Sequence, residues 1–290
     1  NMVRILDLSQ PAAPVEEGVF RWPDGGIADA VSNGTHMYVA TGQADVGITV
    51  VDITNPAAPT IVGYTRDGDY TRLALAAGCL YAIAERSASP QAERGLRVYD
   101  VAAPASPVAL AWYEGITAPY DLAVAGSRLY TALNGGVRIL GIGDPTDVRR
   151  LGSIATGDPV EAVAIGGARL FLVHGGVLEA YDISDAAAPA ALGSLRVAVP
   201  NAGEAGVAAS TGGDFVLTTH RHHGTTVVAV TGSGAVSPAA VLVEEPTGRV
   251  DRVAAGDRRA FALASGRLVE VDTADPAHPV VVAVREPGTN

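Results

Sequence analysis

Residues Ile48–Thr60 read ITVVDITNPAAPT, and variants of this stretch recur along the chain. They include VRILDLSQPAAPV from Val3, LRVYDVAAPASPV from Leu96 and LVEVDTADPAHPV from Leu268. Seven copies align on the place that Asp52 occupies, at intervals of 41 to 48 residues. The aligned residues are Asp7, Asp52, Asp100, Gly141, Asp182, Ala229 and Asp272. Such a period indicates stacked supersecondary units, so the repeat decides the fold.

One repeat contains four short apolar runs. From Tyr120 the chain reads YDLAVAGSRLYTALNGGVRILGIGDPTDVRRLGSI, in which turn residues separate DLAVAG, RLYTAL, VRIL and VRRLGSI. The step Asn134-Gly135 is a strong signal for a two-residue hairpin. No segment has the 3.6-residue apolar stripe of an amphipathic helix, which excludes helical repeats. Each repeat therefore predicts a four-stranded antiparallel sheet.

A four-stranded sheet in a repeat of this length is typical of a β-propeller blade. Because one blade cannot bury both faces alone, the repeats are expected to stack as a single domain over residues 1–290. Hydrophobic residues make up 48% of the chain, enough for a sizeable core, and 34 glycines and 18 prolines suit many turns. The sequence thus predicts an all-β fold, a β-propeller of seven blades of four-stranded antiparallel sheets. Six blades are the alternative, because the first copy starts at its third strand.

The recurring aspartate and prolines are interpreted as a structural turn after the third strand. The aspartate can accept hydrogen bonds from backbone amides that follow it. The prolines restrict φ and lead into the fourth strand, where a missing amide donor is tolerated. Gly141 in the fourth copy and Ala229 in the sixth lack the aspartate, so those turns must be built differently.

This pattern resembles the LVIVD repeat, whose strand is written here as ITVVD and LRVYD. The resemblance covers nearly the whole chain, and the Asp-x-x-x-Pro-x-x-Pro turn accompanies the strand in several copies. It implies a β-propeller, often in secreted or surface-associated bacterial proteins. It implies no particular reaction or cofactor.

Composition limits the classes of partner. The chain has 31 acidic and 20 basic residues, a net charge of −11, and such an acidic surface disfavours nucleic acid. No run of about 20 apolar residues predicts a membrane span, and no signal peptide is recognised. Cys79 is the only cysteine and is expected to be a buried thiol. A protein, a glycan or a small molecule remains as the partner.

The most unusual candidate is a cluster in the sixth repeat, which also departs from the repeat pattern. It consists of His220, Arg221, His222 and His223. Because His220 and His222 are two residues apart, they would face the same side of a strand and could share a metal ion. A third ligand would have to come from another repeat, such as His174 or Glu204. The alternatives are a solvated polar hairpin, and imidazoles that contact a ligand or transfer protons.

Charged residues also stand at the starts of the predicted first strands. They are Asp29, Arg72, Asp121, Glu161, Glu204 and Arg252. In a propeller these starts would converge near the mouth of the channel, where they could hold a polar ligand or a cation. They could equally pair with one another and hydrate the channel. Tyr120 and Trp22 lie close to connections between repeats and are candidate ligand contacts or packing residues.

Two hypotheses of function follow. The first is a binding or interaction module that presents a ligand or partner site on one face, with Trp22 in an exposed patch. The second is an enzyme, a lyase, isomerase or hydrolase, at the channel mouth. In it His220 or His174 would be the base, Asp121 or Glu161 would orient that base, and Arg72 or Arg252 would hold an anionic intermediate.

Overall fold

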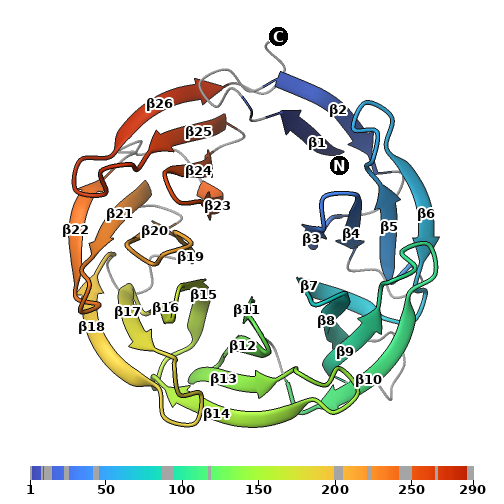
Figure 1. The fold of residues 1–290 in the computed structure, drawn as a ribbon, viewed down its shortest axis with the longest axis horizontal. Helices are drawn as coiled ribbons and strands as arrows, with labels where there is room; N and C mark the ends of the chain where they lie inside the picture. Colours follow the sequence, from blue (N-terminus) through green and yellow to red (C-terminus); the bar gives the residue numbers. More distant parts are fainter. Residues whose placement is uncertain are drawn as a thin grey trace. The chain divides into compact units, whose positions relative to one another are not determined.

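The computed structural model shows a chain of strands joined by turns (Figure 1). It describes residues 2–7, 9, 15–22, 26–41, 46–86, 94–116, 119–198, 205–220, 224–241, 250–264 and 267–285. These residues form 26 strands and no helix, which confirms the predicted all-β class.

Within the described ranges, six sheets have four strands each and one has two. The two-stranded sheet consists of β1 (Met2–Asp7) and β2 (Val15–Arg21). The next three sheets consist of β3 (Asp29–Ser32), β4 (His36–Ala40), β5 (Ile48–Asp52) and β6 (Thr60–Tyr64); β7 (Asp69–Ala76), β8 (Cys79–Arg86), β9 (Gly95–Asp100) and β10 (Val108–Glu114); and β11 (Asp121–Ala125), β12 (Arg128–Leu133), β13 (Gly136–Gly141) and β14 (Arg149–Ala155). The last three consist of β15 (Val160–Gly166), β16 (Arg169–His174), β17 (Val177–Asp182) and β18 (Ala190–Arg196); β19 (Ala205–Ala209), β20 (Phe215–His220), β21 (Gly224–Val230) and β22 (Val236–Val241); and β23 (Val250–Ala255), β24 (Arg259–Ala264), β25 (Arg267–Asp272) and β26 (Val280–Arg285).

Each sheet follows chain order, so neighbouring strands in the sequence are neighbours in the sheet. The pairing is antiparallel, as in the β15–β18 sheet, where β15 pairs with β16, β16 with β17 and β17 with β18. The predicted four-stranded antiparallel blade is therefore confirmed. The structure has six such blades, the alternative count, while the first copy of the repeat forms only the pair β1–β2.

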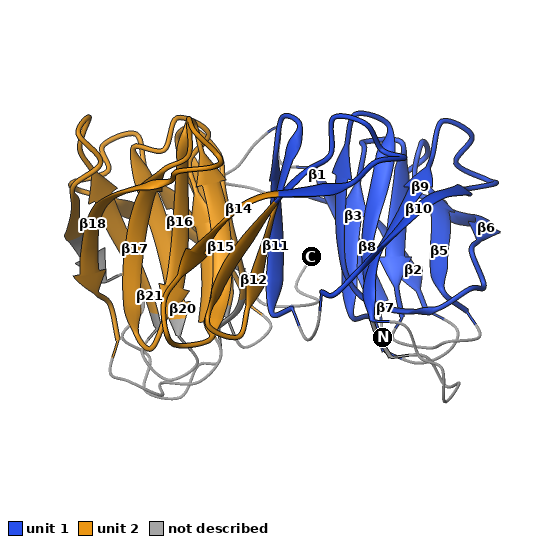
Figure 2. Ribbon diagram, turned by 90° about the horizontal axis from the view of Figure 1, so that it is seen from below, with its two compact units in different colours: residues 1–129, 140–150 blue, residues 130–139, 151–290 orange. Residues whose placement is uncertain are grey.

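The chain divides into two compact units, coloured separately in Figure 2. In unit 1 (residues 1–129 and 140–150), β3 and β4 pack against β7, and β7 packs against β11. In unit 2 (residues 130–139 and 151–290), β15 packs against β19, and β19 and β20 pack against β23. Apolar side chains fill the spaces between consecutive sheets, as around Tyr38 and Tyr70 in unit 1 and around Phe171 and Val216 in unit 2. Successive repeats in each unit thus share a core.

The turn after the third strand is built by the repeat aspartate, as predicted. Asp52 accepts hydrogen bonds from the backbone nitrogen and the hydroxyl of Thr54, at 2.8 and 2.7 Å. These bonds favour the charged carboxylate and lower the pKa of Asp52. The fourth copy has Gly141 at the aligned place, and Asp144 accepts from the backbone nitrogen and hydroxyl of Thr146. Asp185 accepts from the Ala187 nitrogen at the matching place in the fifth copy. In the sixth copy the hydroxyl of Thr231 accepts from the Ala235 nitrogen at 3.1 Å.

The same turns also join consecutive sheets through glycines in the fourth strands. A Cβ atom at Gly63 in β6 would lie 2.5 Å from the carbonyl oxygen of Ala105, in the turn of the next sheet. A Cβ atom at Gly18 would overlap the carbonyl oxygen of Pro56, and one at Gly152 that of Ala186. The absent side chain therefore lets the backbone of one turn lie directly against the preceding fourth strand.

Candidate functional site

In each four-stranded sheet, the first strand begins, the second ends and the third begins at the same end. In the β15–β18 sheet this end is marked by the paired residues Val160, His174 and Val177. We call it the hairpin end, and we call the opposite end, which carries the aspartate turns, the turn end. The described candidates predicted from the sequence lie at hairpin ends or in the connections that precede first strands.

The histidine cluster falls largely outside the described residues. His220 is the last residue of β20 and pairs with Ala205 and Gly224. Its side chain lies outside the described part, as do Arg221, His222, His223 and Glu204. The metal site predicted at His220 and His222 therefore stays a prediction. In the part that the structure describes, no group of three His, Cys, Asp or Glu side chains could hold a metal ion.

Two of the charged first-strand residues in unit 1 connect neighbouring strands. Asp29 accepts a hydrogen bond from the backbone nitrogen of Leu73 in β7, at 2.9 Å. Arg72 donates from Nε to the carbonyl oxygen of Tyr120, at 2.8 Å, just before β11. These polar groups therefore hold first strands together, and the ring of Tyr120 remains exposed.

The remaining candidates are scattered over both units. Trp22 is buried and packs edge-on against Phe20 with ring centroids 5.5 Å apart, so the predicted exposed patch does not include it. Asp121 is half-buried at the start of β11 in unit 1, whereas Arg252 is exposed in β23 of unit 2. Among the described residues, the structure brings two pairs of predicted residues together. Arg72 contacts the backbone of Tyr120 in unit 1, and His174 lies beside Glu161 in the β15–β18 sheet.

His174 lies at the centre of a polar cluster at this hairpin end. The residue is 9% exposed. Its Nδ1 atom lies 3.8 Å from a carboxylate oxygen of Asp158, and its Nε2 atom lies 3.5 Å from Oε1 of Glu179. Neither ring nitrogen has a hydrogen-bond partner among the described residues. The imidazole is thus enclosed and flanked by carboxylates without being held by them.

Glu161 completes the cluster from the first strand. The backbone nitrogen of Gly175, next to His174, donates to its carboxylate, and His174 interacts with it electrostatically. Its Oε2 atom is buried without a hydrogen-bond partner among the described residues. Burial raises the pKa of Glu161, and the Gly175 and His174 interactions reduce that rise.

Glu179 is fixed by its own strand. The hydroxyl of Tyr181 donates to Oε2 of Glu179 at 2.8 Å, which leaves Oε1 facing His174. Burial and this carboxylate together raise the pKa of Tyr181 to about 12. The phenol therefore remains a hydrogen-bond donor at neutral pH, and it orients Glu179 toward the imidazole.

We did not predict Asp158, Glu179 or Tyr181 from the sequence, although the repeat carries a signal for Glu179. The residue three places before the aligned aspartate position is arginine in three copies and threonine in two, and only one copy has an acid. These residues are Arg4, Thr49, Arg97, Arg138, Glu179, Thr226 and Val269. An inverted charge at a repeated position indicates a local specialisation.

Replacing Glu161 by glutamine is expected to stabilise the fold increasingly as pH rises. The folded-state pKa of Glu161 is raised, chiefly by burial. The stabilising contribution of the protonated Glu161 is therefore fully present below the pKa of the unfolded state, about 4.3. It is lost as pH rises through the pKa of the folded state. Glutamine is neutral throughout. Urea denaturation of both proteins at pH 4.5, 6 and 8 should show the glutamine variant gaining stability relative to the wild type.

His174, Asp158 and Glu179 also face this region, so the comparison should be repeated in a His174→Leu background. The control is Asp144→Asn, because hydrogen bonds from Thr146 lower the pKa of Asp144. The stability difference of this variant from the wild type changes only below about pH 3.9, the unfolded value, so it should stay constant between pH 4.5 and 8. A pH-independent difference for Glu161→Gln would contradict the buried-carboxylate interpretation.

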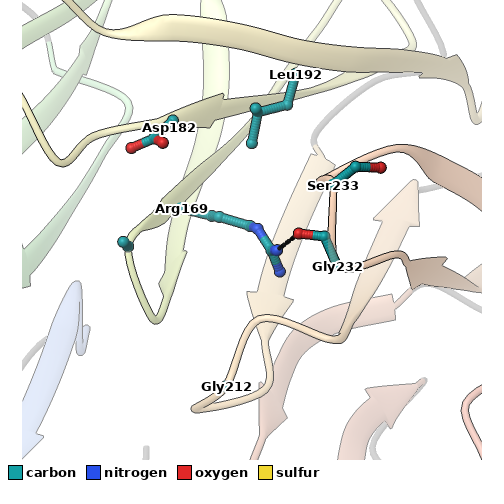
Figure 3. A pocket seen from close by; sticks show the side chains of 7 residues that line it. Arg169, Asp182, Leu192, Gly212, Gly232 and Ser233 are labelled. Carbon is teal, nitrogen blue, oxygen red and sulfur yellow. Dashed lines mark hydrogen bonds between the residues drawn. The ribbon is translucent and has the colours of Figure 1, made fainter.

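A pocket of about 280 Å³ lies at the turn end of the β15–β18 sheet, beside the β19–β22 sheet (Figure 3). Arg169 donates to the carbonyl oxygens of Gly213 and Gly232, at 2.9 and 2.6 Å. Asp182, Leu192 and Ser233 also line the pocket. Because the guanidinium already joins two loops of the neighbouring sheet, we interpret this pocket as part of the joint between blades.

Comparison with known proteins supports the architecture. The LVIVD repeat family matches residues 25–67. A functionally unknown protein from Desulfotomaculum acetoxidans is similar with a TM-score of 0.70 and 11% identity, over 94% of this chain and 92% of that one. The β-propeller domain of Cps50 (Swd1) from Myceliophteria thermophila gives 0.68 and 12%, over 93% and 89%. The periplasmic gluconolactonase of Pseudomonas aeruginosa gives 0.67 and 16%, over 88% and 84%.

These identities are low, so the likeness concerns the fold alone. No curated protein sequence matches the chain. Among the described residues, no helix is long and apolar enough to cross a membrane. The four-stranded sheets, the aspartate turns and the solved structures agree: the chain is a β-propeller and carries an LVIVD repeat at residues 25–67.

Proposed function

We propose that the chain is a binding module whose ligand site lies at the hairpin end of the β15–β18 blade, around His174. The observation that carries the proposal is the buried imidazole whose two nitrogens have no hydrogen-bond partner among the described residues. Leaving a polar group buried and unpaired costs about 1–3 kcal/mol. A group of this kind calls for an explanation, and a ligand that completes its hydrogen bonds provides one.

Other repeats support a role for this histidine beyond folding. Second strands of three other sheets end in apolar residues at the equivalent place, namely Ala40, Leu133 and Ala264. Leu133 belongs to β12, which like β16 has six residues. His174 therefore stands where a blade of the same design has an apolar residue. Three carboxylates meet at this place: Glu161 and Glu179 from two strands, and Asp158 from the connection before β15. Binding sites commonly contain polar groups that lower the stability of the fold but serve recognition.

The proposal is tested by replacing His174 with leucine, the residue that β12 carries at this place. At pH 8 we expect the variant to unfold at the same or a higher urea concentration than the wild type. His278→Leu is the control, because His278 is exposed and pairs with Asp275 at 2.9 Å. A small-molecule screen by thermal shift should give stabilising compounds whose effect disappears in His174→Leu and persists in His278→Leu. Marked destabilisation by His174→Leu, with no histidine-dependent compound, would overturn the proposal.

A second candidate is catalysis by the same residues. The raised pKa of Glu161 beside His174 supplies a carboxyl and an imidazole that could exchange a proton with a bound substrate. The enzyme hypothesis also assigned roles to Asp121 and Arg72, which belong to unit 1. Hydrolysis of a lactone or ester panel that is lost in both His174→Leu and Glu161→Gln would favour this candidate over binding alone.

A further inference from the structure

We infer that the His174 site recognises a cationic group, specifically a primary ammonium. The inference rests on the proposed function and names the ligand class of that same site. It follows from the charge around the imidazole and from the hydrogen-bonding atoms that remain open there.

The charge of the site is negative on every side. Asp158 approaches Nδ1 of His174, Glu179 approaches Nε2, and Glu161 interacts with the ring from the first strand. His174 is thus a basic group that interacts with all three carboxylates. An anionic ligand would meet three carboxylates, whereas a cation would be attracted by them.

The open atoms are acceptors. Oε2 of Glu161 has no hydrogen-bond partner among the described residues. Oε1 of Glu179 faces His174 at 3.5 Å, while its Oε2 atom is occupied by Tyr181. The carboxylate of Asp158, at the solvent side, is the third acceptor. A primary ammonium has three donors and no acceptor, so its donors correspond in number to these three acceptors.

Solvent access is provided by Asp158. Its side chain is 68% exposed, whereas the side chains of His174 and Glu179 are 11% and 25% exposed. The site thus has a carboxylate at its solvent side and the imidazole behind it. A ligand can meet the Asp158 charge first and then exchange its water shell for the buried acceptors, which strengthens the charge-assisted hydrogen bonds.

The protein's own basic side chains could compete with a ligand for these carboxylates. The sequence contains no lysine, so all its strongly basic side chains are guanidinium groups. A guanidinium is a planar group with five donors, whereas an ammonium is a compact point charge. Arginines pair with carboxylates elsewhere in the chain, as Arg4 with Glu16 and Arg259 with Glu270. A compact ammonium group for this site must therefore come from outside the chain.

The test uses the full chain and three probes of matched shape: n-butylammonium, butyrate and n-butanol, at pH 7.5 and constant ionic strength. The readout is the imidazole NMR signal of His174, assigned by its loss in His174→Leu. We expect butylammonium to shift this signal in a saturable manner. Glu179→Gln should weaken the affinity at least tenfold, because it removes the charge that faces Nε2. Asp275→Asn, which alters an exposed carboxylate beside His278, should leave the affinity unchanged.

The possible outcomes separate this inference from the proposed function. Saturable shifts by butyrate or butanol but not by butylammonium would overturn the ammonium assignment and leave His174 as a ligand site. Equal affinity for butylammonium in Glu179→Gln and in the wild type would overturn it as well, because the binding charge would then lie elsewhere. If no probe shifts the signal, the ammonium assignment fails, and the compound screen with His174→Leu decides the binding function.

Discussion

Gly152→Ala is expected to lower the free energy of unfolding by about 3 kcal/mol, because the added methyl group has no room. Its Cβ atom would overlap the carbonyl oxygen of Ala186, which belongs to the turn after β17. The obstacle is backbone, so no side-chain rotation relieves it. Either the β15–β18 sheet shifts away from β14, or the turn that Asp182 holds must distort.

The matched control is Gly212→Ala, in the hairpin between β19 and β20. No atom lies within 4 Å of a Cβ built at Gly212, and its backbone needs no left-handed conformation. This variant should be neutral or slightly stabilising, since alanine reduces the freedom of the unfolded chain. Gly63→Ala, which meets the Ala105 oxygen at 2.5 Å, repeats the test in unit 1.

Urea denaturation followed by circular dichroism gives the three midpoints. We expect Gly152→Ala and Gly63→Ala to shift the midpoint down and Gly212→Ala to leave it in place. If Gly152→Ala were as stable as Gly212→Ala, the turn would not lie against the fourth strand, and the contact between consecutive blades would have to be built in another way.

These glycines show how far the sequence could predict the fold. The repeat of Asp52 and its prolines predicted the sheets because a strand and its following turn depend on residues close together in the chain. The turn of the fourth copy is local too: Gly141 offers no side chain there, and Asp144 accepts from the backbone of Thr146. The contact of Gly152 with Ala186 joins two repeats, so only the packing of one sheet on the next reveals it.

The candidate site has the same limit. The enzyme hypothesis expected Asp121 or Glu161 to orient His220 or His174, and strand pairing brings His174 and Glu161 together. Asp158 and Glu179 were not predicted, because their proximity to the imidazole depends on the register of the hairpin and on the connection before β15. Asp29 was correctly located at the start of its first strand, whereas Arg72 is the fourth residue of β7. Their bonds to backbone groups of neighbouring strands could not be derived from composition or spacing.

A second large effect is expected in the last blade, where Arg259→Met should destabilise the protein by about 3 kcal/mol. Arg259 begins β24 and donates from one guanidinium nitrogen to Oε1 of Glu270 at 3.1 Å. Glu270 is 1% exposed, and its Oε2 atom has no hydrogen-bond partner among the described residues. Removing the arginine would leave the buried Glu270 carboxylate without the guanidinium that pairs with it. Asp272, 3.7 Å from the same guanidinium, would add repulsion rather than compensation.

The chain offers a control with the same arginine exposure. Arg4 lies 3.2 Å from Glu16, and the arginine side chain is 35% exposed in both pairs, but Glu16 is 34% exposed and Glu270 is 1% exposed. Arg4→Met should therefore cost only about 0.2–1 kcal/mol, the range of surface ion pairs. The difference between the two variants isolates the burial of the carboxylate.

The double variant Arg259→Met/Glu270→Met decides the mechanism. Replacing both partners removes the buried charge together with its cation, and an apolar pair of similar size is often neutral or stabilising in such a place. The second substitution should thus recover most of the stability that the first one removed, as measured by urea denaturation at pH 7. If the double variant were less stable than Arg259→Met alone, Glu270 would contribute through packing in the core and not as an unpaired charge. Arg259 would then stabilise β24 through contacts other than the ion pair.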